Sequence, residues 1–242
     1  MTVTLATGVK VMYPEDIVNY KRASPKRTQT SFNIRPFQVA DTKTIQDVYL
    51  EAHNSFIFPA FEAGLQKPYI NVPALLFVHC LTTITESLYI GIGLLFILVV
   101  GVYLSYRVKF MNHLNHSMTT DLHDIENFYQ CGSDESSFWV AEIAGKVVGF
   151  VGMKQRDSTT IELQRLTVAP QYRRRGIGES LCRNVISFYK RKKFQQLILE
   201  CTEVHFAGKS LYAKLGFNID ERIAAPFALS AITLEHYSLN LT

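Results

Sequence analysis

The 242-residue sequence predicts a mixed α/β domain interrupted by an apolar helical insert, and three features predict it. The apolar-alternating run 161–168 has the period of a strand, and the run 179–193 after it has the period of an amphipathic helix. Residues 138–153 have the pattern of a hairpin with a turn at Ala144-Gly145. Between the first strand and this hairpin, residues 72–107 are strongly apolar.

The remaining elements follow in chain order. Asn33–Phe37 is the expected first strand, and Asp41 is the expected cap of the helix after it. Residues 195–202 predict a second buried strand. Residues 208–217 predict a short helix that ends at Gly216 and leads into a further strand.

A glycine-containing turn, Arg173–Gly178, joins the strand 161–168 to the helix 179–193. The first turn of a helix offers free N–H groups and the positive end of the helix dipole. Gly176 and Gly178 have no Cβ, so a phosphate can approach the backbone, and three arginines add mobile positive charge. Neither the Walker nor the dinucleotide-binding glycine pattern is present. The turn predicts an anion cradle, with a solvated surface turn as the alternative.

The apolar insert contains a run, Leu88–Tyr106, that carries no charge over a length close to the ~20 residues that cross a bilayer as a helix. The shorter apolar run Val72–Ile84 precedes it, and the polar segment Thr82–Ser87 separates the two. One alternative is a buried hairpin of a soluble protein. A single span would separate residues 33–67 from their own sheet, so a helical hairpin, re-entrant or made of two short spans, is preferred.

Positive residues flank the insert: Lys67 precedes it, and Arg107 and Lys109 follow it. The positive-inside tendency places both ends, and the catalytic domain with them, in the cytosol. The predicted organisation is a flexible polar tail (1–31), the first strand and helix (32–71), a membrane-associated hairpin (72–107) and the remainder of the domain (108–242).

Two motifs connect the chain to a known superfamily. Arg173-x-x-Gly176-x-Gly178 resembles the Q/R-x-x-G-x-G/A signature of GCN5-related N-acetyltransferases (GNAT), which holds the pyrophosphate of acetyl-CoA. Leu211-Tyr212-x-x-Leu215-Gly216-Phe217 is similar to the LYxxxGF element of the same enzymes. The resemblance implies the GNAT fold, a central mixed, mostly antiparallel sheet flanked by helices.

The position of the apolar insert narrows the resemblance. Together with the segments 118–125, 138–142 and 146–149, it makes the chain similar to the camello or N-acetyltransferase-8-like branch. Members of that branch are membrane-bound enzymes of the endoplasmic reticulum. They acetylate the amine of cysteine S-conjugates, or of aspartate in the neuronal branch, and some acetylate protein lysines. The resemblance covers the chain after about residue 30 and does not specify the acceptor.

The resemblance implies roles for residues around the turn. The backbone of the strand before it binds the pantetheine arm and donates to the thioester oxygen. The residues expected to bind acetyl-CoA are Leu166, Thr167, Val168, Arg173, Arg174, Arg175, Gly176, Ile177 and Gly178. Tyr212 is the expected general acid, with ordinary core packing as its alternative.

The general base is less defined. Glu162 lies eleven residues before Arg173, which matches a glutamate that acts as a base through water in the histone-acetyltransferase branch. Its alternative is a solvated glutamate at a strand end. Arg165 is the candidate to bind an acceptor carboxylate, but strand alternation places it opposite Glu162 unless the strand has a bulge. Four histidines are alternative bases, with His205 the best placed: His113, His116, His123 and His205.

Composition agrees with this interpretation. The net charge of +4 suits an anionic cofactor and an anionic membrane face and is too small to indicate nucleic acid. The four cysteines have neither metal-ligand spacing nor a secreted disulfide pattern, so no metal is expected. We therefore expect a membrane-bound, acetyl-CoA-dependent N-acetyltransferase acting on an amino-acid-like amine. The alternatives are a protein-lysine acetyltransferase and a non-catalytic acyl-CoA-binding scaffold.

Overall fold

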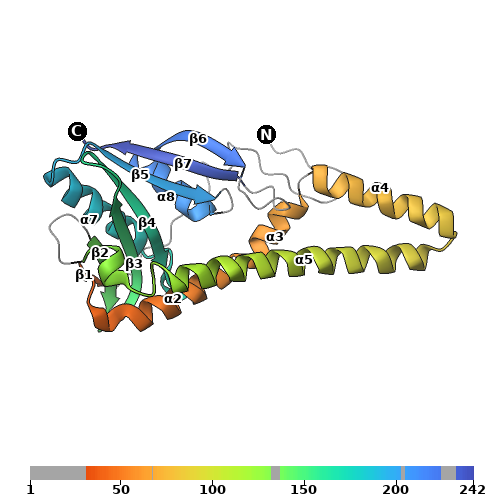
Figure 1. Ribbon diagram of the computed structural model, residues 1–242, viewed down its shortest axis with the longest axis horizontal. Coiled ribbons are helices and arrows are strands. Elements are labelled where there is room, and N and C mark those ends of the chain that lie inside the picture. The colour runs from red at the N-terminus through yellow and green to blue at the C-terminus, as the bar shows by residue number, and fades with distance from the viewer. Residues whose placement is uncertain (1–30, 67, 132–136, 203–204, 225–232) are drawn as a thin grey trace, which may run out of the picture. The chain divides into compact units, whose positions relative to one another are not determined.

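A computed structural model describes residues 31–66, 68–131, 137–202, 205–224 and 233–242 (Figure 1). Phe32–Thr242 form one compact unit. Lys67 and nearly all of the predicted tail lie outside the described residues. The strands are β1 (Asn33–Pro36), β2 (Ser137–Ile143), β3 (Lys146–Gln155), β4 (Thr160–Val168), β5 (Gln196–Thr202), β6 (Asn218–Ala224) and β7 (Thr233–Asn240). The helices are η1 (Val39–Asp41), α2 (Thr42–Asn54), α3 (Ile57–Leu65), α4 (Pro68–Thr85), α5 (Leu88–Thr119), α6 (Ile125–Phe128), η2 (Pro170–Tyr172), α7 (Ile177–Arg191) and α8 (Phe206–Leu215).

The strands form one seven-stranded sheet in the order β1-β2-β3-β4-β5-β7-β6, which confirms the predicted mixed α/β class. Neighbouring strands run antiparallel except for β4 and β5, which are parallel. The predicted hairpin is β2–β3, and its turn residues Ala144 and Gly145 both have positive φ (48° and 80°). Positive φ at both central residues matches the twist of the flanking strands.

Strands β4 and β5 separate partway along the sheet. Their pairing runs from Thr160↔Gln196 to Leu163↔Leu199 and then stops, although both strands continue. On its other edge β4 pairs with β3 through a bulge. Phe150 pairs with Thr167 and Gly152 with Gln164, so two residues of β4 lie opposite one residue of β3. The site described below lies where the two strands diverge.

Each face of the sheet has its own core. On one face, α7 buries Ile177, Leu181, Val185 and Tyr189 against the strands, as its apolar period predicts. On the other face, the buried side of α2 packs with the end of α5 and the segment that leads into α6. Asp41 is at the N-cap position of α2, as predicted. Its carboxylate, however, accepts from Arg35 and from the Gln38 amide and makes no hydrogen bond to the helix it precedes.

The apolar insert forms two helices, α4 and α5, that pack against each other with a bend at Glu86, where φ is 52° (Figure 1). Among the described residues, α5 is the one helix long and apolar enough to cross a membrane, judged by length and composition. It extends past the apolar run and ends at Thr119, with Leu114 and Ser117 buried in the domain core. A single continuous helix therefore joins the insert to the domain.

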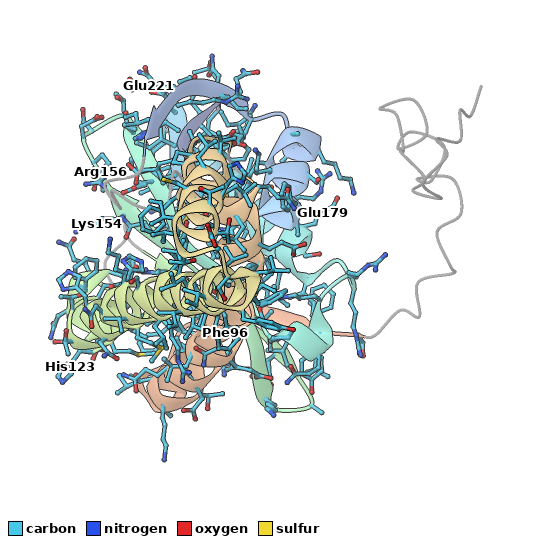
Figure 2. The ribbon with its side chains drawn as sticks, turned by 90° about the vertical axis from the view of Figure 1, so that its right-hand side faces the viewer. Phe96, His123, Lys154, Arg156, Glu179 and Glu221 are labelled. Atoms are coloured by element: carbon cyan, nitrogen blue, oxygen red, sulfur yellow. The ribbon has the colours of Figure 1, made fainter. Side chains whose placement is uncertain are left out.

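Large apolar side chains cover the outside of this hairpin. Phe96 on α5 lies on that surface, where 69% of it is exposed (Figure 2). Helix α4 also exposes large apolar side chains: Val72, Leu75, Leu76, Phe77 and Ile84. Those of α5 include Leu88, Tyr89, Ile90, Ile92, Ile97 and Leu104. An apolar surface of this extent indicates a membrane or a protein partner.

Candidate active site

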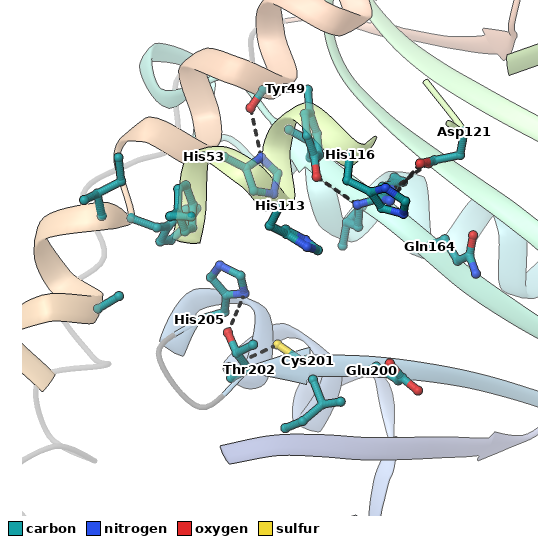
Figure 3. Close-up of a pocket in the computed structure, with 18 of the residues that line it drawn as sticks. Tyr49, His53, His113, His116, Asp121, Gln164, Glu200, Cys201, Thr202 and His205 are labelled. Atoms are coloured by element: carbon teal, nitrogen blue, oxygen red, sulfur yellow. Dashed lines mark hydrogen bonds and ion pairs between the residues drawn. The ribbon is translucent and has the colours of Figure 1, made fainter. Parts of the chain in front are cut away.

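A cavity of about 850 Å³ lies where β4 and β5 diverge (Figure 3). Strand β4 contributes residues 162–167 to its wall, and β5 contributes residues 200–202. Helices α2, α3, α5 and α8 also contribute residues to the wall. The histidines at 53, 113 and 205 come from three different elements, and their rings lie around one shared space (Figure 3).

The edge of β4 that faces β5 has unpaired backbone groups beyond Leu163, because the ladder stops there. Leu166 and Thr167, both predicted to bind acetyl-CoA, line the cavity along this edge. Peptide groups of an unpaired strand edge can bind an extended ligand in the manner of an added strand. The hydroxyl of Thr167 is also buried and has no hydrogen-bond partner among the described residues. This edge is the part of the site best suited to an arm that contains amide groups.

The glycine turn follows directly after β4. Gly176 is the N-cap of α7 with φ of 85°, and Arg174 also has positive φ (63°). The first N–H groups of a helix have no acceptor within the helix, so those of Ile177 and Gly178 are available to an anion. A Cβ at Gly178 would make only ordinary contacts, the nearest at 3.6 Å to Leu211.

The arginines of the turn differ in their roles. The Arg173 guanidinium donates to the backbone oxygens of Val168 (3.1 Å) and Ala52 (3.1 Å) and to the Ser55 hydroxyl (3.2 Å). Arg173 is therefore not the mobile charge that the sequence suggested, because it binds the end of α2, where a cation complements the helix dipole. Arg174 is exposed and Arg175 lies over the Tyr172 ring. Anion binding at the turn would depend mainly on backbone N–H groups.

Arg165 lies in the bulge of β4, with φ of 55°. The bulge turns its side chain to the face that carries Glu162, so the two predicted site residues line the same cavity. Two nitrogens of Arg165 donate to the buried carboxylate of Asp121 (2.7 and 2.8 Å), and a third donates to the Tyr49 hydroxyl (2.8 Å). Tyr129 also donates to Asp121 (3.1 Å). Alternation alone could not predict this placement, because it depends on the extra residue.

Glu162 is 5% exposed, which excludes the solvated glutamate that was its alternative. Its Oε2 accepts from the Gln164 amide (2.6 Å) and pairs with Arg156. Glu162 therefore lies at the cavity wall as an ion-paired group.

Tyr212 is buried at the cavity wall, and no described residue hydrogen-bonds its hydroxyl. Its ring packs against Phe217 and Tyr237. Burial raises the pKa of Tyr212 well above its usual value, and the neighbouring thiols and Tyr237 add to the shift. Its hydroxyl remains protonated at physiological pH and can donate a proton or a hydrogen bond.

His53 is a cavity residue that the sequence interpretation missed. Its Nδ1 lies 2.9 Å from the backbone oxygen of Tyr49, one turn earlier on α2. Burial lowers the pKa of His53 to about 4, and burial lowers that of His205 to about 4 as well. The available signal was helical period, because Ile45, Tyr49 and Ala52 define the buried side of α2 and His53 continues it.

The other candidate histidines are less enclosed. His113 and His116 of α5 line the cavity but are exposed, and His123 lies on the surface after α5 (Figure 2). Within the described part of the chain, no group of three or more His, Cys, Asp or Glu residues is arranged to hold a metal ion.

Comparison with known proteins now places the chain in a family. Residues 105–217 match the Acetyltransferase (GNAT) family. The chain is 32% identical over 199 residues to an N-acetylaspartate synthetase of Xenopus tropicalis, covering 81% of this chain and 72% of that protein. It is 31% identical over 204 residues to the camello N-acetyltransferase of Xenopus laevis, covering 83% and 92%. The chain belongs to the GNAT acetyltransferase family.

The fold agrees with this assignment. A GNAT-family acetyltransferase from Staphylococcus aureus Mu50 superposes with a TM-score of 0.55 at 17% identity, covering 88% of this chain and all of that one. The expected GNAT fold and camello-type resemblance are thus confirmed, and the protein is an N-acetyltransferase. Members of this GNAT family use acetyl-CoA as the acetyl donor.

Proposed function

We propose that the protein is a membrane-bound N-acetyltransferase that transfers acetyl from acetyl-CoA to the amine of an amino-acid-like acceptor. Cysteine S-conjugates are the first choice, and aspartate is the second. The observation that carries the proposal is the cavity itself, which joins an open strand edge, an arginine and an apolar wall in one space. The roles below are assigned on that basis.

Acetyl-CoA would bind with its pyrophosphate on the N–H groups at the start of α7 and its pantetheine arm along the free edge of β4. Arg174 and Arg175, together with Gly176, Ile177 and Gly178, would surround the phosphates. Arg173 would position the turn, because its guanidinium already holds the end of β4 to α2.

Charge favours an acceptor that carries a carboxylate. Of the five N–H groups of a guanidinium, Arg165 uses three on Asp121 and Tyr49, which leaves two for a ligand. The interior acids of the cavity, Asp121 and Glu162, are both paired with arginines. An acceptor carboxylate would therefore meet donors and no uncompensated negative charge in this part of the wall.

Part of the wall beside α3 and α5 is apolar. Phe56, Ile57 and Ala60 line it from one side, and Tyr106 and Phe110 line it from the other. A substituent that buries about 100 Å² of apolar surface gains about 2.5 kcal/mol, which corresponds to roughly 70-fold in affinity. The wall should therefore select an S-aryl or S-alkyl cysteine over aspartate.

Two groups would serve the chemistry. Tyr212 would protonate the departing thiolate, since its hydroxyl is neutral and unpaired within the described structure. The resemblance implies Glu162 as the group that accepts the amine proton through a water molecule. Its pairing with Arg156 weakens this second role, because protonating the carboxylate removes the ion pair.

The hairpin would hold the enzyme in the membrane of the endoplasmic reticulum, with the catalytic domain in the cytosol. Leu88–Tyr106 extends about 28 Å as a helix, close to the thickness of a hydrocarbon core. Ser105 and Tyr106, at the end of this run, and Lys109, just after it, line the cavity. The apolar side of the cavity would then open near the lipid headgroups, where an amphipathic acceptor concentrates.

The acceptor is tested with purified enzyme in detergent, labelled acetyl-CoA and three acceptors: S-benzylcysteine, aspartate and a lysine peptide. We expect the highest kcat/KM for S-benzylcysteine and a raised KM for that acceptor in Arg165→Lys, which keeps the charge but loses the planar donor pair. Preference for the peptide would support a protein-lysine acetyltransferase. Coenzyme A binding without turnover of any acceptor would support a scaffold.

The membrane assignment is tested with Cys80 on α4, whose thiol is not covered by other parts of the protein. In sealed vesicles, a charged maleimide should fail to label Cys80 if the hairpin is embedded. Labelling of a Ser87→Cys variant then shows which side of the vesicle the bend reaches. Full labelling of Cys80 in intact vesicles would contradict membrane insertion.

A further inference from the structure

We propose that Nε2 of His53 accepts the proton that the acceptor amine loses during acetyl transfer. This inference rests on the proposed function, because it assigns a further residue to that same site. Three observations lead to it: the fixed tautomer of the ring, its position in the cavity and the contacts that occupy the other candidate bases.

The tautomer follows from one hydrogen bond. Nδ1 of His53 lies 2.9 Å from the backbone oxygen of Tyr49. A carbonyl oxygen can only accept, so Nδ1 must carry the proton in the neutral ring. Nε2 then bears the lone pair. The backbone of α2 holds the imidazole in one orientation, which is the arrangement a proton acceptor requires.

The position of the ring places that lone pair at the acceptor side of the cavity. His53 lines the cavity together with Arg165, which is assigned to the acceptor carboxylate, and its ring centre lies 6.3 Å from that of Phe56, which belongs to the apolar wall. An amino acid held by its carboxylate and its substituent has its α-amine between these two groups. The close-up shows the ring turned toward the open centre (Figure 3).

Burial, together with the charged and titratable groups around His53, keeps its ring neutral before the reaction. Burial is the main reason that its pKa falls to about 4. The groups that face it, His205 from the β5–α8 junction, Arg165 from β4 and His113 from α5, all lower the pKa further. A neutral imidazole does not repel an amine. The amine nitrogen becomes cationic, and so more acidic, in the tetrahedral intermediate, and the imidazole can then accept its proton.

The competing bases are less suited. Glu162 is bound by Arg156 and Gln164, so a proton on its Oε2 would compete with both contacts. His205 is enclosed like His53, but its Nδ1 faces the Thr202 hydroxyl at 3.2 Å. A hydroxyl can donate or accept, so this contact does not fix the tautomer.

The step balances without an added reagent. The neutral amine attacks the thioester carbonyl, and the C–N bond forms. One N–H proton passes to Nε2 of His53. The C–S bond then breaks, and the thiolate takes the hydroxyl proton of Tyr212. The proton on His53 returns to the tyrosinate through water, which regenerates both groups and leaves the N-acetyl amine and coenzyme A.

The test compares single Gln substitutions at four positions, using the acceptor that the wild-type enzyme turns over best: His53, His205, Glu162 and His123. Glutamine can hydrogen-bond but cannot accept a proton. We expect His53→Gln to lower kcat by about 100-fold or more, with the acceptor KM and the coenzyme A Kd near wild type. His123→Gln, which changes an exposed residue outside the cavity, should leave the rate unchanged.

Chemical rescue provides a second readout that a structural role would not give. His53→Ala leaves space in the cavity, so added imidazole should restore part of kcat in proportion to its unprotonated fraction as pH is varied. Wild-type kcat in His53→Gln, or a rate loss confined to Glu162→Gln or His205→Gln, would overturn the inference and leave the proposed function intact. A wild-type enzyme that binds coenzyme A but acetylates no amine would overturn both.

Discussion

Substituting Gly176 tests whether the turn before α7 binds the cofactor phosphates. Gly176→Glu places a carboxylate next to the N–H groups of Ile177 and Gly178, where the pyrophosphate is proposed to lie. Two unit charges 4 Å apart repel by about 4 kcal/mol at an effective dielectric constant near 20, which corresponds to roughly 1000-fold in Kd. We therefore expect coenzyme A binding to disappear from a calorimetric titration at micromolar protein.

A matched control separates charge from strain. Gly145 in the β2–β3 turn has φ of 80°, close to the 85° of Gly176, and a Cβ there would meet nothing within 4 Å. Gly145→Glu and Gly176→Glu therefore add the same charge and the same left-handed strain, about 1–2 kcal/mol each. Both should lower the melting temperature similarly, but only Gly176→Glu should lose coenzyme A. Equal affinity in the two variants would refute the cofactor placement.

Three further predictions concern the acid, the hairpin and acid stability. Tyr212→Phe should lower kcat more than it changes the coenzyme A Kd, and an unchanged kcat from pH 6 to about 10 would remove Tyr212 from the mechanism. Gly91→Ala places a Cβ that overlaps the Thr82 side chain of the neighbouring helix, whereas the Cβ of Gly93→Ala meets nothing within 4 Å. Both substitutions gain about 1 kcal/mol in helix propensity, so only the overlap in Gly91→Ala should lower the melting temperature. Equal melting temperatures of the two variants would show that the helices do not pack at Gly91. Arg35 donates to Asp41 and lowers the pKa of that carboxyl below its usual range. The resulting stability is present above a pH of about 4 and falls as pH drops through the lower folded-state pKa, so Arg35→Met should be less stable at neutral pH and show a flatter acid limb in urea unfolding.

Elements set by local rules were predictable from the sequence. The turn of β2–β3, the glycine turn before α7 and the helix that ends at Gly216 depend on residues that tolerate positive φ, and all three are found where expected. The end of α5, by contrast, could not be located from a residue of this kind. Hydropathy falls after Tyr106, but a change in hydropathy marks the end of an apolar surface and not the end of a helix.

The parts of the site that the sequence left open depend on tertiary contacts. His53 was overlooked because one histidine on an amphipathic helix usually packs or caps, and only the fold shows which elements surround it. Thr167 was predicted for its backbone. Only the packing around it shows that its hydroxyl is buried without a hydrogen-bond partner in the described part of the chain. The alternation of a strand predicts which of its own residues share a face, but it does not predict which residues of other elements lie across the cavity.

The bulge at Arg165 shows how the fold maintains a conformation that local preference opposes. A positive φ at a non-glycine residue costs about 1–3 kcal/mol. Removing one partner of a buried ion pair costs about 3–5 kcal/mol, because the other charge is left unpaired. Asp121 is 3% exposed and both of its oxygens bind Arg165, so the loss of this pair outweighs the relief of strain. The carboxylate of Asp121 thus holds β4 in the bulged form, and that form presents the arginine to the cavity.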